Sequence, residues 1–262
     1  MSVVQEYISK CRDIIEAIAK QEKEIALAAK WFSETILKGR MVHVFGSGHS
    51  RIMVEEMWPR YGSFPGFNPM VELSLTFHNP VVGSNGQRQA MFLENVPGLA
   101  ERILRNFDVT AEDTALIISS SGCNIVPIEM AELFQKKKIK VVALITAQHA
   151  KANKSKRTDG KKLNNFADLV LDTGAPDGDA MIRIPGLAVP VSPGSTVGGI
   201  IIINSIKAEV ARLLTEAGSP PTVLTSASVA GEEKARELFE SAYDEHAHRL
   251  AKLFAQIKES NF

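Results

Sequence analysis

A strand that runs straight into a glycine loop and a helix is the feature that most constrains the fold of this chain. Val42–Phe45 is an apolar run typical of a β-strand, and Gly46–Ser50 follows it before helical spacing begins. Such a junction directs unpaired backbone N–H groups and the positive end of a helix dipole at one point, which suits a small anion. The stretch therefore predicts an anion-binding corner built from Gly46, Ser47, Gly48 and Ser50.

The same pattern returns later in the chain. Thr114–Ile118 predicts a strand, Ser119–Asn124 is a hydroxyl-rich turn, and Ile125–Lys138 has helical spacing. In a parallel sheet, both loops would lie at the carboxyl ends of their strands, where open α/β sheets bind ligands. We therefore expect the two loops to form one site.

The remaining chain predicts further helices and strands. Val3–Leu37 has helical spacing that fits one long helix or two with a kink, and Ile139–Thr146 is the clearest buried strand. Val71–Leu75 and Asp168–Asp172 predict short strands, and Met181–Ile184 predicts an edge strand. This order favours an α/β fold.

Two helices are expected near the end of the sequence. Val197–Leu214 predicts a helix with Ser195 or Thr196 as its N-cap. Its first half, Ile200–Ile203, is apolar on all sides, which is typical of the core or of a subunit contact. Glu232–Ile257 has the pattern of a charged amphipathic helix.

Composition excludes several classes of protein. The chain has 262 residues, 45% of them hydrophobic, and its 30 basic and 30 acidic side chains cancel, so no overall field would recruit nucleic acid or an anionic membrane. No stretch reaches the ~18 apolar residues of a membrane span, and no secretory leader is visible. Cys11 and Cys123 show no paired spacing. We expect a cytoplasmic protein that binds neither nucleic acid nor membrane.

Nucleotide and metal motifs are absent from the sequence. A dinucleotide fingerprint needs glycine where Arg51 stands, and no Gly-Lys-Ser/Thr follows the glycine loop as a P-loop requires. His246 and His248 are two apart on a predicted helix and so point to different sides. We therefore expect no cofactor and no bound metal.

Three side chains near the first loop are candidates for acid or base chemistry. Glu56, beside Glu55, falls at the end of the helix that the loop starts, and Glu94 ends an irregular segment that could fold over the loop. His49 lies at the mouth of the loop, where it either touches a ligand or caps the helix. Paired glutamates also form solvated helix faces, so position alone leaves both interpretations open.

The loops Gly46–Ser50 and Ser119–Asn124, called the two serine loops below, together resemble those of the SIS (sugar isomerase) domain family. The resemblance covers about Trp31 to Gly218. The resemblance implies a three-layer α/β/α fold whose five-stranded parallel sheet has flavodoxin-like order. It also implies a homodimer or homotetramer with sites at the subunit boundary. Residues 1–38 would form a helical segment, 39–218 the phosphosugar-binding domain and 219–262 a helical extension.

The resemblance also assigns roles to individual residues. In that family the last serine of the first loop and the hydroxyls of the second hold a sugar phosphate. Asn124 replaces a threonine that is often found there. The phosphosugar-binding residues predicted for this chain beyond the first loop are Ser119, Ser120, Ser121, Asn124, Ser195 and Thr196.

Two branches of the family are similar in more detail. Glu56–Gly62 and Leu93–Asn95 resemble the stretches that carry the acidic residues of N-acetylmuramic acid 6-phosphate etherases. Glu55–Tyr61 equally resembles phosphoheptose isomerases, although Arg51 and Ile52 stand where those enzymes have a metal-binding histidine. Asp172–Ala180 is similar to a poorly characterised SIS subgroup.

Both branches begin by removing a proton from the carbon next to a sugar carbonyl. We predict Glu56 as the base, with Glu94 or His49 as its acid partner. The favoured activity is an aldose–ketose isomerase of the phosphoheptose type. The alternatives are an etherase or lyase acting on an amino-sugar 6-phosphate, and a non-catalytic phosphosugar sensor.

Overall fold

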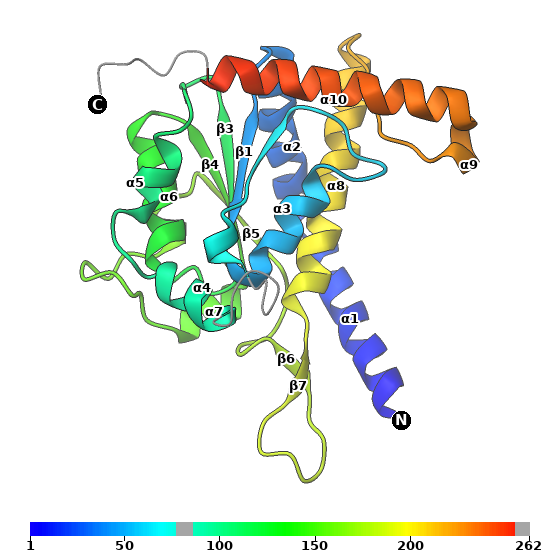
Figure 1. Ribbon diagram of the computed structural model, residues 1–262. Helices are drawn as coiled ribbons and strands as arrows, with labels where there is room; N and C mark the ends of the chain where they lie inside the picture. The colour runs from blue at the N-terminus through cyan, green and yellow to red at the C-terminus, as the bar shows by residue number, and fades with distance from the viewer. Residues whose placement is uncertain (77–85, 255–262) are drawn as a thin grey trace.

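A parallel β-sheet forms the centre of the molecule in a computed structural model that describes residues 1–76 and 86–254 (Figure 1). Its strands lie in the order β2-β1-β3-β4-β5. Their bounds are Val42–Gly46 (β1), Phe67–Met70 (β2), Thr114–Ile118 (β3), Lys140–Ile145 (β4) and Leu169–Asp172 (β5). Both β1 and β3 are buried along their whole length, which explains why they are mostly apolar.

Helices cover both faces of this sheet. Along β3, Leu116 and Ile118 join the core of one face, whereas Ala115 and Ile117 join the core of the other, as the twofold period of a strand requires. The first face carries α1 (Val3–Ala19), α2 (Glu22–Leu37), α3 (Arg51–Met57) and α8 (Ser195–Glu216). The second carries α5 (Leu99–Leu104) and α6 (Ile125–Lys136). The predicted three-layer α/β/α fold with a five-stranded parallel sheet is confirmed.

The register of the central strands brings the two serine loops together. Gly46 of β1 pairs with Ile118 of β3. Ser47 and Ser119 therefore leave the sheet side by side at its carboxyl edge. The two loops lie together there, as the sequence predicted.

The N-terminal helical region is two helices rather than one. The break between α1 and α2 lies at Gln21, whose side chain donates to the Asp172 carbonyl and accepts from the Asp172 N–H, both at 2.8 Å. These two bonds fix the break to the end of β5. The other short helices are η1 (Gly48–Ser50), η2 (Leu73–Leu75), α4 (Gln87–Leu93), α7 (Ala147–Ala152) and η3 (Leu163–Phe166).

The strand predicted over Val71–Leu75 is wrong. That stretch includes the single helical turn η2, and the strand lies earlier, at β2. β2 contains Pro69, which cannot donate to a neighbouring strand and is tolerated because β2 is an edge. Part of the irregular segment before Glu94, residues 77–85, lies outside the described residues.

The edge strand predicted over Met181–Ile184 does not join the main sheet. Instead β6 (Ala180–Ile182) pairs antiparallel with β7 (Val191–Pro193). This β6–β7 ribbon projects from the sheet end opposite to the long helix α10 (Glu232–Phe254), which follows the short α9 (Ala227–Ala230) (Figure 1).

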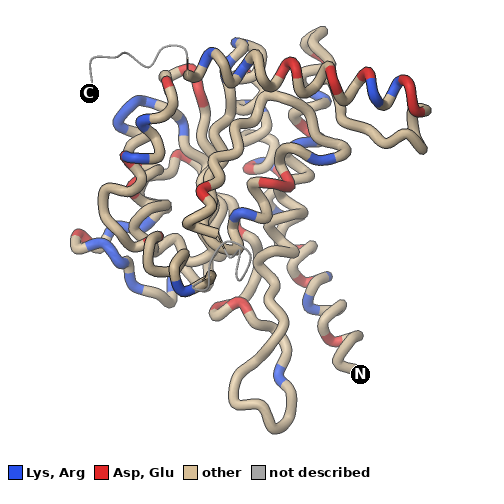
Figure 2. The backbone as a smooth tube through the Cα atoms, in the orientation of Figure 1, with Lys and Arg blue, Asp and Glu red and all other residues tan. Residues whose placement is uncertain are grey.

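Charges of both signs are mixed along the chain. Figure 2 shows Lys and Arg interspersed with Asp and Glu along α10. Pairs such as Lys234 with Glu237 and Arg249 with Glu245 neutralise each other locally. This mixing agrees with the formal net charge of zero.

Candidate functional site

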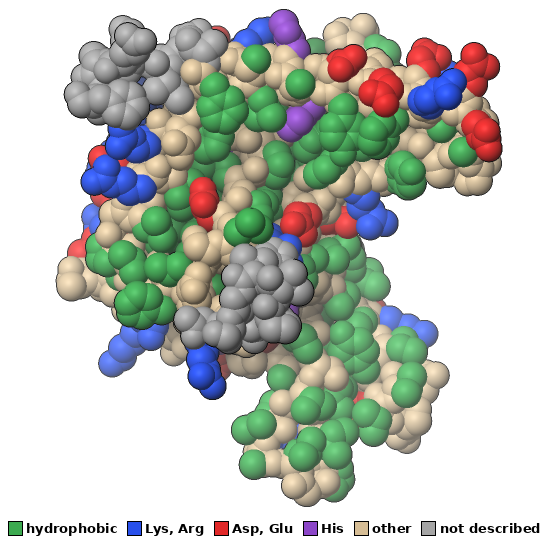
Figure 3. Space-filling view, viewed as in Figure 1, with side chains coloured by type: hydrophobic (Ala, Val, Ile, Leu, Met, Phe, Trp, Pro, Cys, Tyr) green, Lys and Arg blue, Asp and Glu red, His purple; other side chains and the backbone are tan. Residues whose placement is uncertain are grey.

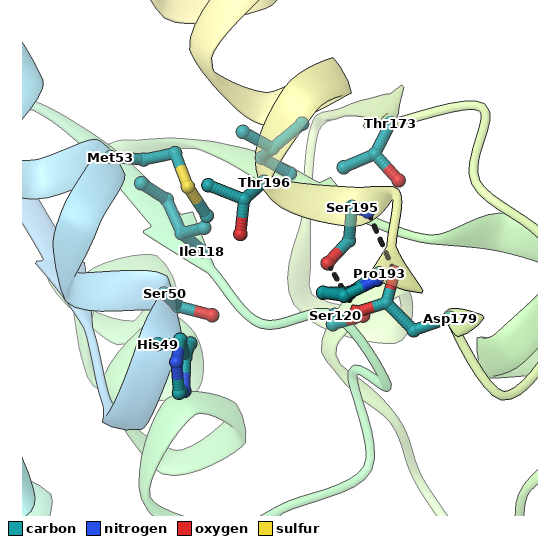
Figure 4. A pocket seen from close by; sticks show the side chains of 11 residues that line it. His49, Ser50, Met53, Ile118, Ser120, Thr173, Asp179, Pro193, Ser195 and Thr196 are labelled. Carbon is teal, nitrogen blue, oxygen red and sulfur yellow. Dashed lines mark hydrogen bonds between the residues drawn. The ribbon is translucent and has the colours of Figure 1, made fainter. Parts of the chain in front are cut away.

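A cavity of about 290 Å³ lies between the two serine loops and the N-terminus of α8 (Figure 4). Hydroxyl and apolar side chains line it together with one imidazole and one carboxylate: His49, Ser50, Met53, Ile118, Ser120, Leu144, Thr173, Asp179, Pro193, Ser195 and Thr196. This volume is near the lower end for small-molecule sites. The cavity therefore fits a small polar ligand.

The first loop has its shape because of its glycines. A Cβ on Gly46 would come within 2.8 Å of the Ser50 carbonyl oxygen, and Gly48 has a φ of +56°. The loop then closes one helical turn, in which the Ser50 N–H donates to the Ser47 carbonyl at 3.0 Å. This turn places Ser50 at the entrance to α3, where it lines the cavity.

The second loop is held by its own hydroxyls. The Ser119 Oγ accepts the Gly122 N–H at 3.3 Å, and the Ser121 Oγ accepts the Cys123 N–H at 3.2 Å. Ser120 lies within 3.1 Å of the Thr146 hydroxyl, and of the three serines it is the one that lines the cavity. A hydroxyl that accepts a bond still has its own proton to donate. Ser119 and Ser121 thus shape the loop behind Ser120.

Glu94 joins the two loops. Its carboxylate accepts the Ser47 hydroxyl at 2.7 Å and the Asn124 amide at 2.8 Å, one partner from each loop. Burial raises the pKa of Glu94, and the bond from Ser47 opposes part of that rise. Glu94 is therefore biased toward its protonated form compared with an ordinary glutamate.

The N-terminus of α8 forms the wall of the cavity opposite Ser50 (Figure 4). The prediction that Ser195 or Thr196 is the N-cap is wrong, because both lie inside the helix and Gly194 is the N-cap. Asp179 supplies the missing acceptor: its carboxylate accepts the N–H groups of Gly194 and Ser195 and the Ser195 hydroxyl, at 3.0, 2.6 and 2.8 Å. Ser195 and Thr196 still line the cavity.

Glu56 lies beside the cavity rather than in its lining. Met53 lines the cavity, and Glu56 is one helical turn further along the same face of α3. Its carboxylate accepts the Asn204 amide of α8 at 3.0 Å and pairs with Arg60 at 3.2 Å. Lys207 of α8 donates to the Glu56 carbonyl at 2.8 Å. Glu56 is thus fixed between α3 and α8.

Residues 6–146 match the SIS domain, and this segment includes both serine loops, Glu56 and Glu94. The chain belongs to the SIS domain family. The resemblance carried by the two serine loops is thereby confirmed.

Relatives of this SIS domain protein extend over most of its length. A UPF0309 protein of Geobacillus kaustophilus is 30% identical over 93% of this chain and 95% of its own length. A second UPF0309 protein, from Geobacillus sp. strain WCH70, is 32% identical over 87% of this chain and 91% of its own length. The structure of a phosphoheptose isomerase from Neisseria gonorrhoeae covers 79% of this chain and 96% of its own, at 14% identity and a TM-score of 0.47.

The predicted site residues of the SIS domain fall into groups. His49, Ser50, Ser120, Ser195 and Thr196 share the cavity, while Glu94 bridges the loops behind it and Glu56 lies one turn away. Sequence reasoning missed Met53, Thr173 and Asp179. Met53 could have been found from its helical spacing after Ser50, and Asp179 from its place in the turn-rich stretch 172–180.

Two general searches of the structure complete this description. Within residues 1–76 and 86–254, no group of three or more His, Cys, Asp or Glu side chains is arranged to hold a metal ion. Among the helices of those same residues, none is long and apolar enough to cross a lipid bilayer.

Proposed function

We propose that this SIS domain protein binds a sugar phosphate in its cavity and interconverts the aldose and ketose forms of that sugar. One observation carries this proposal: Ser50 and Ser120, which follow two adjacent strands, line the same cavity. Membership of the family supports the class of ligand.

The phosphate would bind at the serine loops. Ser50 stands where the first loop turns into α3, and such a turn offers backbone N–H groups as well as a hydroxyl. Ser120 brings a second hydroxyl from the neighbouring loop, and His49 brings a ring nitrogen. No lysine or arginine lines the described cavity. Hydroxyls, N–H dipoles and His49 would therefore supply the attraction for the anion.

Glu56 is the proposed base. Glu56 Oε1 accepts the Asn204 amide and lies 3.2 Å from Arg60 Nε, which fixes the position of a carboxylate that, when ionised, can take a proton from carbon. A sugar held by its phosphate at Ser50 would lie against Met53, one helical turn from Glu56. The proton removed from one carbon would return to its neighbour, giving the isomer.

The acid partner would be Glu94 or His49. Burial raises the pKa of Glu94, so this carboxyl holds a proton to higher pH than an ordinary glutamate and suits proton donation to the carbonyl oxygen. His49 lines the cavity directly. Replacing each in turn would distinguish them.

Deuterium exchange tests the isomerase proposal. The protein would be incubated in D₂O with a panel of aldose and ketose phosphates, and deuterium entry beside the carbonyl followed by NMR. We expect exchange with at least one sugar and its loss, by about 100-fold or more, in Glu56→Gln. The neighbouring Glu55→Gln is the matched control, because Glu55 is exposed and pairs with Arg51. Equal exchange in wild type and Glu56→Gln would rule out Glu56 as the base.

A non-catalytic sensor is the second candidate function. It is favoured by the position of Glu56, which lies outside the cavity lining and is already bonded to Asn204 and Arg60. In the same experiment a sensor would bind a sugar phosphate without any exchange. An etherase or lyase would show exchange together with release of a substituent.

We further infer that copies of the chain associate as a homodimer or homotetramer. Hydrophobic side chains gather on the β6–β7 ribbon and on α1 (Figure 3). Among them, Ile8, Ile15, Leu187 and Val189 are 38%, 48%, 54% and 68% exposed. Large exposed apolar patches mark association surfaces.

The two cysteines are free, which supports a reducing, cytoplasmic setting.

A further inference from the structure

The cavity contains a carboxylate that pairs with no lysine or arginine among the described lining residues. Asp179 is the acidic side chain among its described lining residues, and the bonds to its carboxylate come from the Gly194 N–H, the Ser195 N–H and the Ser195 hydroxyl. All three donors are neutral. Since no lysine or arginine lines the described cavity, the charge of Asp179 acts on whatever enters.

This charge lies on one side of the cavity. In Figure 4, His49 and Ser50 lie on one side, and Asp179, Ser195 and Ser120 lie on the other. The N-terminus of α8 would by itself attract an anion, but the Asp179 carboxylate already occupies it. The end of the cavity at His49 and Ser50 is thus suited to an anion, whereas an anion at the α8 end would meet a fixed negative charge.

The carboxylate is held firmly in this place. Asp179 has a φ of +67°, a left-handed conformation that aspartate tolerates better than most residues. Its backbone carbonyl also accepts the Gly194 N–H at 3.1 Å, so main chain and side chain both tie it to the start of α8. Rotating the charge out of the cavity would break several bonds at once.

We propose that Asp179 makes the cavity selective for sugars that carry a single anionic group. The hydroxyl groups of a sugar, or the ammonium group of an amino sugar, would donate to the carboxylate while the phosphate of the same molecule binds at the His49 and Ser50 end. A second phosphate or a carboxylate at that end would be repelled, by about tenfold or more in affinity for like charges several ångströms apart in a partly buried site. This inference rests on the proposed binding of a sugar phosphate.

Matched ligands test the selectivity. Calorimetry would compare glucose 6-phosphate with 6-phosphogluconate, and fructose 6-phosphate with fructose 1,6-bisphosphate, on the wild-type protein. We expect glucose 6-phosphate and fructose 6-phosphate, which carry one anionic group each, to bind about tenfold tighter or more than their partners with two. In Asp179→Asn, which keeps an acceptor for the α8 N–H groups, this ratio should fall toward one. Asp177→Asn is the control, because Asp177 lies in the same turn, pairs with His149 and does not line the cavity.

The outcomes separate the two proposals. If no monophosphate binds to any variant, the proposed function fails and the selectivity with it. If monophosphates bind but the wild type does not discriminate within either pair, only the selectivity fails. A ratio that is unchanged in Asp179→Asn, or that falls equally in Asp177→Asn, would also assign the discrimination to something other than Asp179.

Discussion

At the scale of single residues, Glu94 shows how one side chain can organise a site without lining it. Its two carboxylate oxygens accept one donor from each serine loop, Ser47 and Asn124. Its backbone carbonyl also accepts the Val126 N–H, which lies in the first turn of α6. Glu94 therefore holds together two loops that the sheet has already placed side by side.

Burial of Glu94 makes the stability of the protein depend on pH. The folded state holds this proton more tightly than the unfolded chain, because burial raises the pKa of Glu94. The stabilisation is complete below the unfolded pKa and is lost as pH rises through the folded one. Glu94→Gln removes this loss, so the stability of the variant relative to wild type should increase as pH rises above the ordinary pKa of a glutamate.

Urea unfolding at several pH values would measure this difference. Glu101→Gln, at an exposed position of α5, controls for the loss of one carboxylate. A constant difference between Glu94→Gln and wild type across the pH range would contradict the prediction.

Individual site residues were predictable only where a local pattern carried them. Ser50 and Ser120 follow apolar strands within a few residues, so their place at the cavity could be read from the chain. The contact of Glu94 with Ser47 joins residues far apart in sequence, and that of Asp179 with Ser195 crosses the β6–β7 ribbon. Such contacts cannot be predicted from the spacing of residues along the chain. The roles of the individual site residues stay predictions.

At the scale of elements, the cavity depends on how closely α8 approaches its neighbours. A Cβ on Gly198 would lie 1.9 Å from the Thr173 carbonyl oxygen, at the end of β5. A Cβ on Gly199 would meet the Met53 side chain of α3 at 3.0 Å. These adjacent glycines let the first turns of α8 pack against β5 and α3, and so close the cavity wall.

Gly198→Ala should displace α8 and destabilise the protein. The new methyl group would clash with the Thr173 carbonyl oxygen, and this backbone atom cannot move aside as a flexible side chain could. We therefore expect a loss of about 1–3 kcal/mol in the free energy of unfolding. Gly199→Ala is the matched control: the flexible Met53 side chain can adjust, and alanine is the better helix former, so its effect should be small. Urea unfolding would compare the two, and an equal or smaller loss in Gly198→Ala would contradict this account.

The main elements were predictable because each has a clear pattern of its own. β1, β3 and β4 are mostly apolar runs, and α8 and α10 keep helical spacing over many residues. β2 was missed because an edge strand with Pro69 lacks that pattern. The β6–β7 ribbon was misassigned because its pairing depends on a partner across a turn. The division of the chain at residues 38 and 218 stays a prediction.

At the scale of the whole molecule, the cavity and α10 lie at opposite ends of the sheet. The cavity opens near the β6–β7 ribbon, and α10 lies across the far end (Figure 1). The exposed apolar side chains of α1 and the ribbon lie at the cavity end (Figure 3). Association through these side chains would place two cavities near one interface.

Charged substitutions at these side chains should separate the copies. We expect the wild type to be a dimer or tetramer by light scattering coupled to chromatography, and a variant carrying both Ile8→Asp and Val189→Asp to be a monomer. Val229→Asp is the control, because Val229 is 79% exposed but lies on α9, away from the ribbon. A monomeric wild type, or a double variant that stays associated, would contradict the proposed surface.

The β6–β7 ribbon is at once an apolar protrusion and part of the inner wall. Asp179 precedes β6 and Pro193 ends β7, and both line the cavity, while Tyr7 of α1 donates to the Pro193 carbonyl at 3.0 Å. A molecule that binds the tip of the ribbon and shifts it would therefore change the shape of the cavity through continuous backbone. Because coupling between two binding sites is reciprocal, a ligand in the cavity would then change the affinity of the tip for that molecule by the same factor.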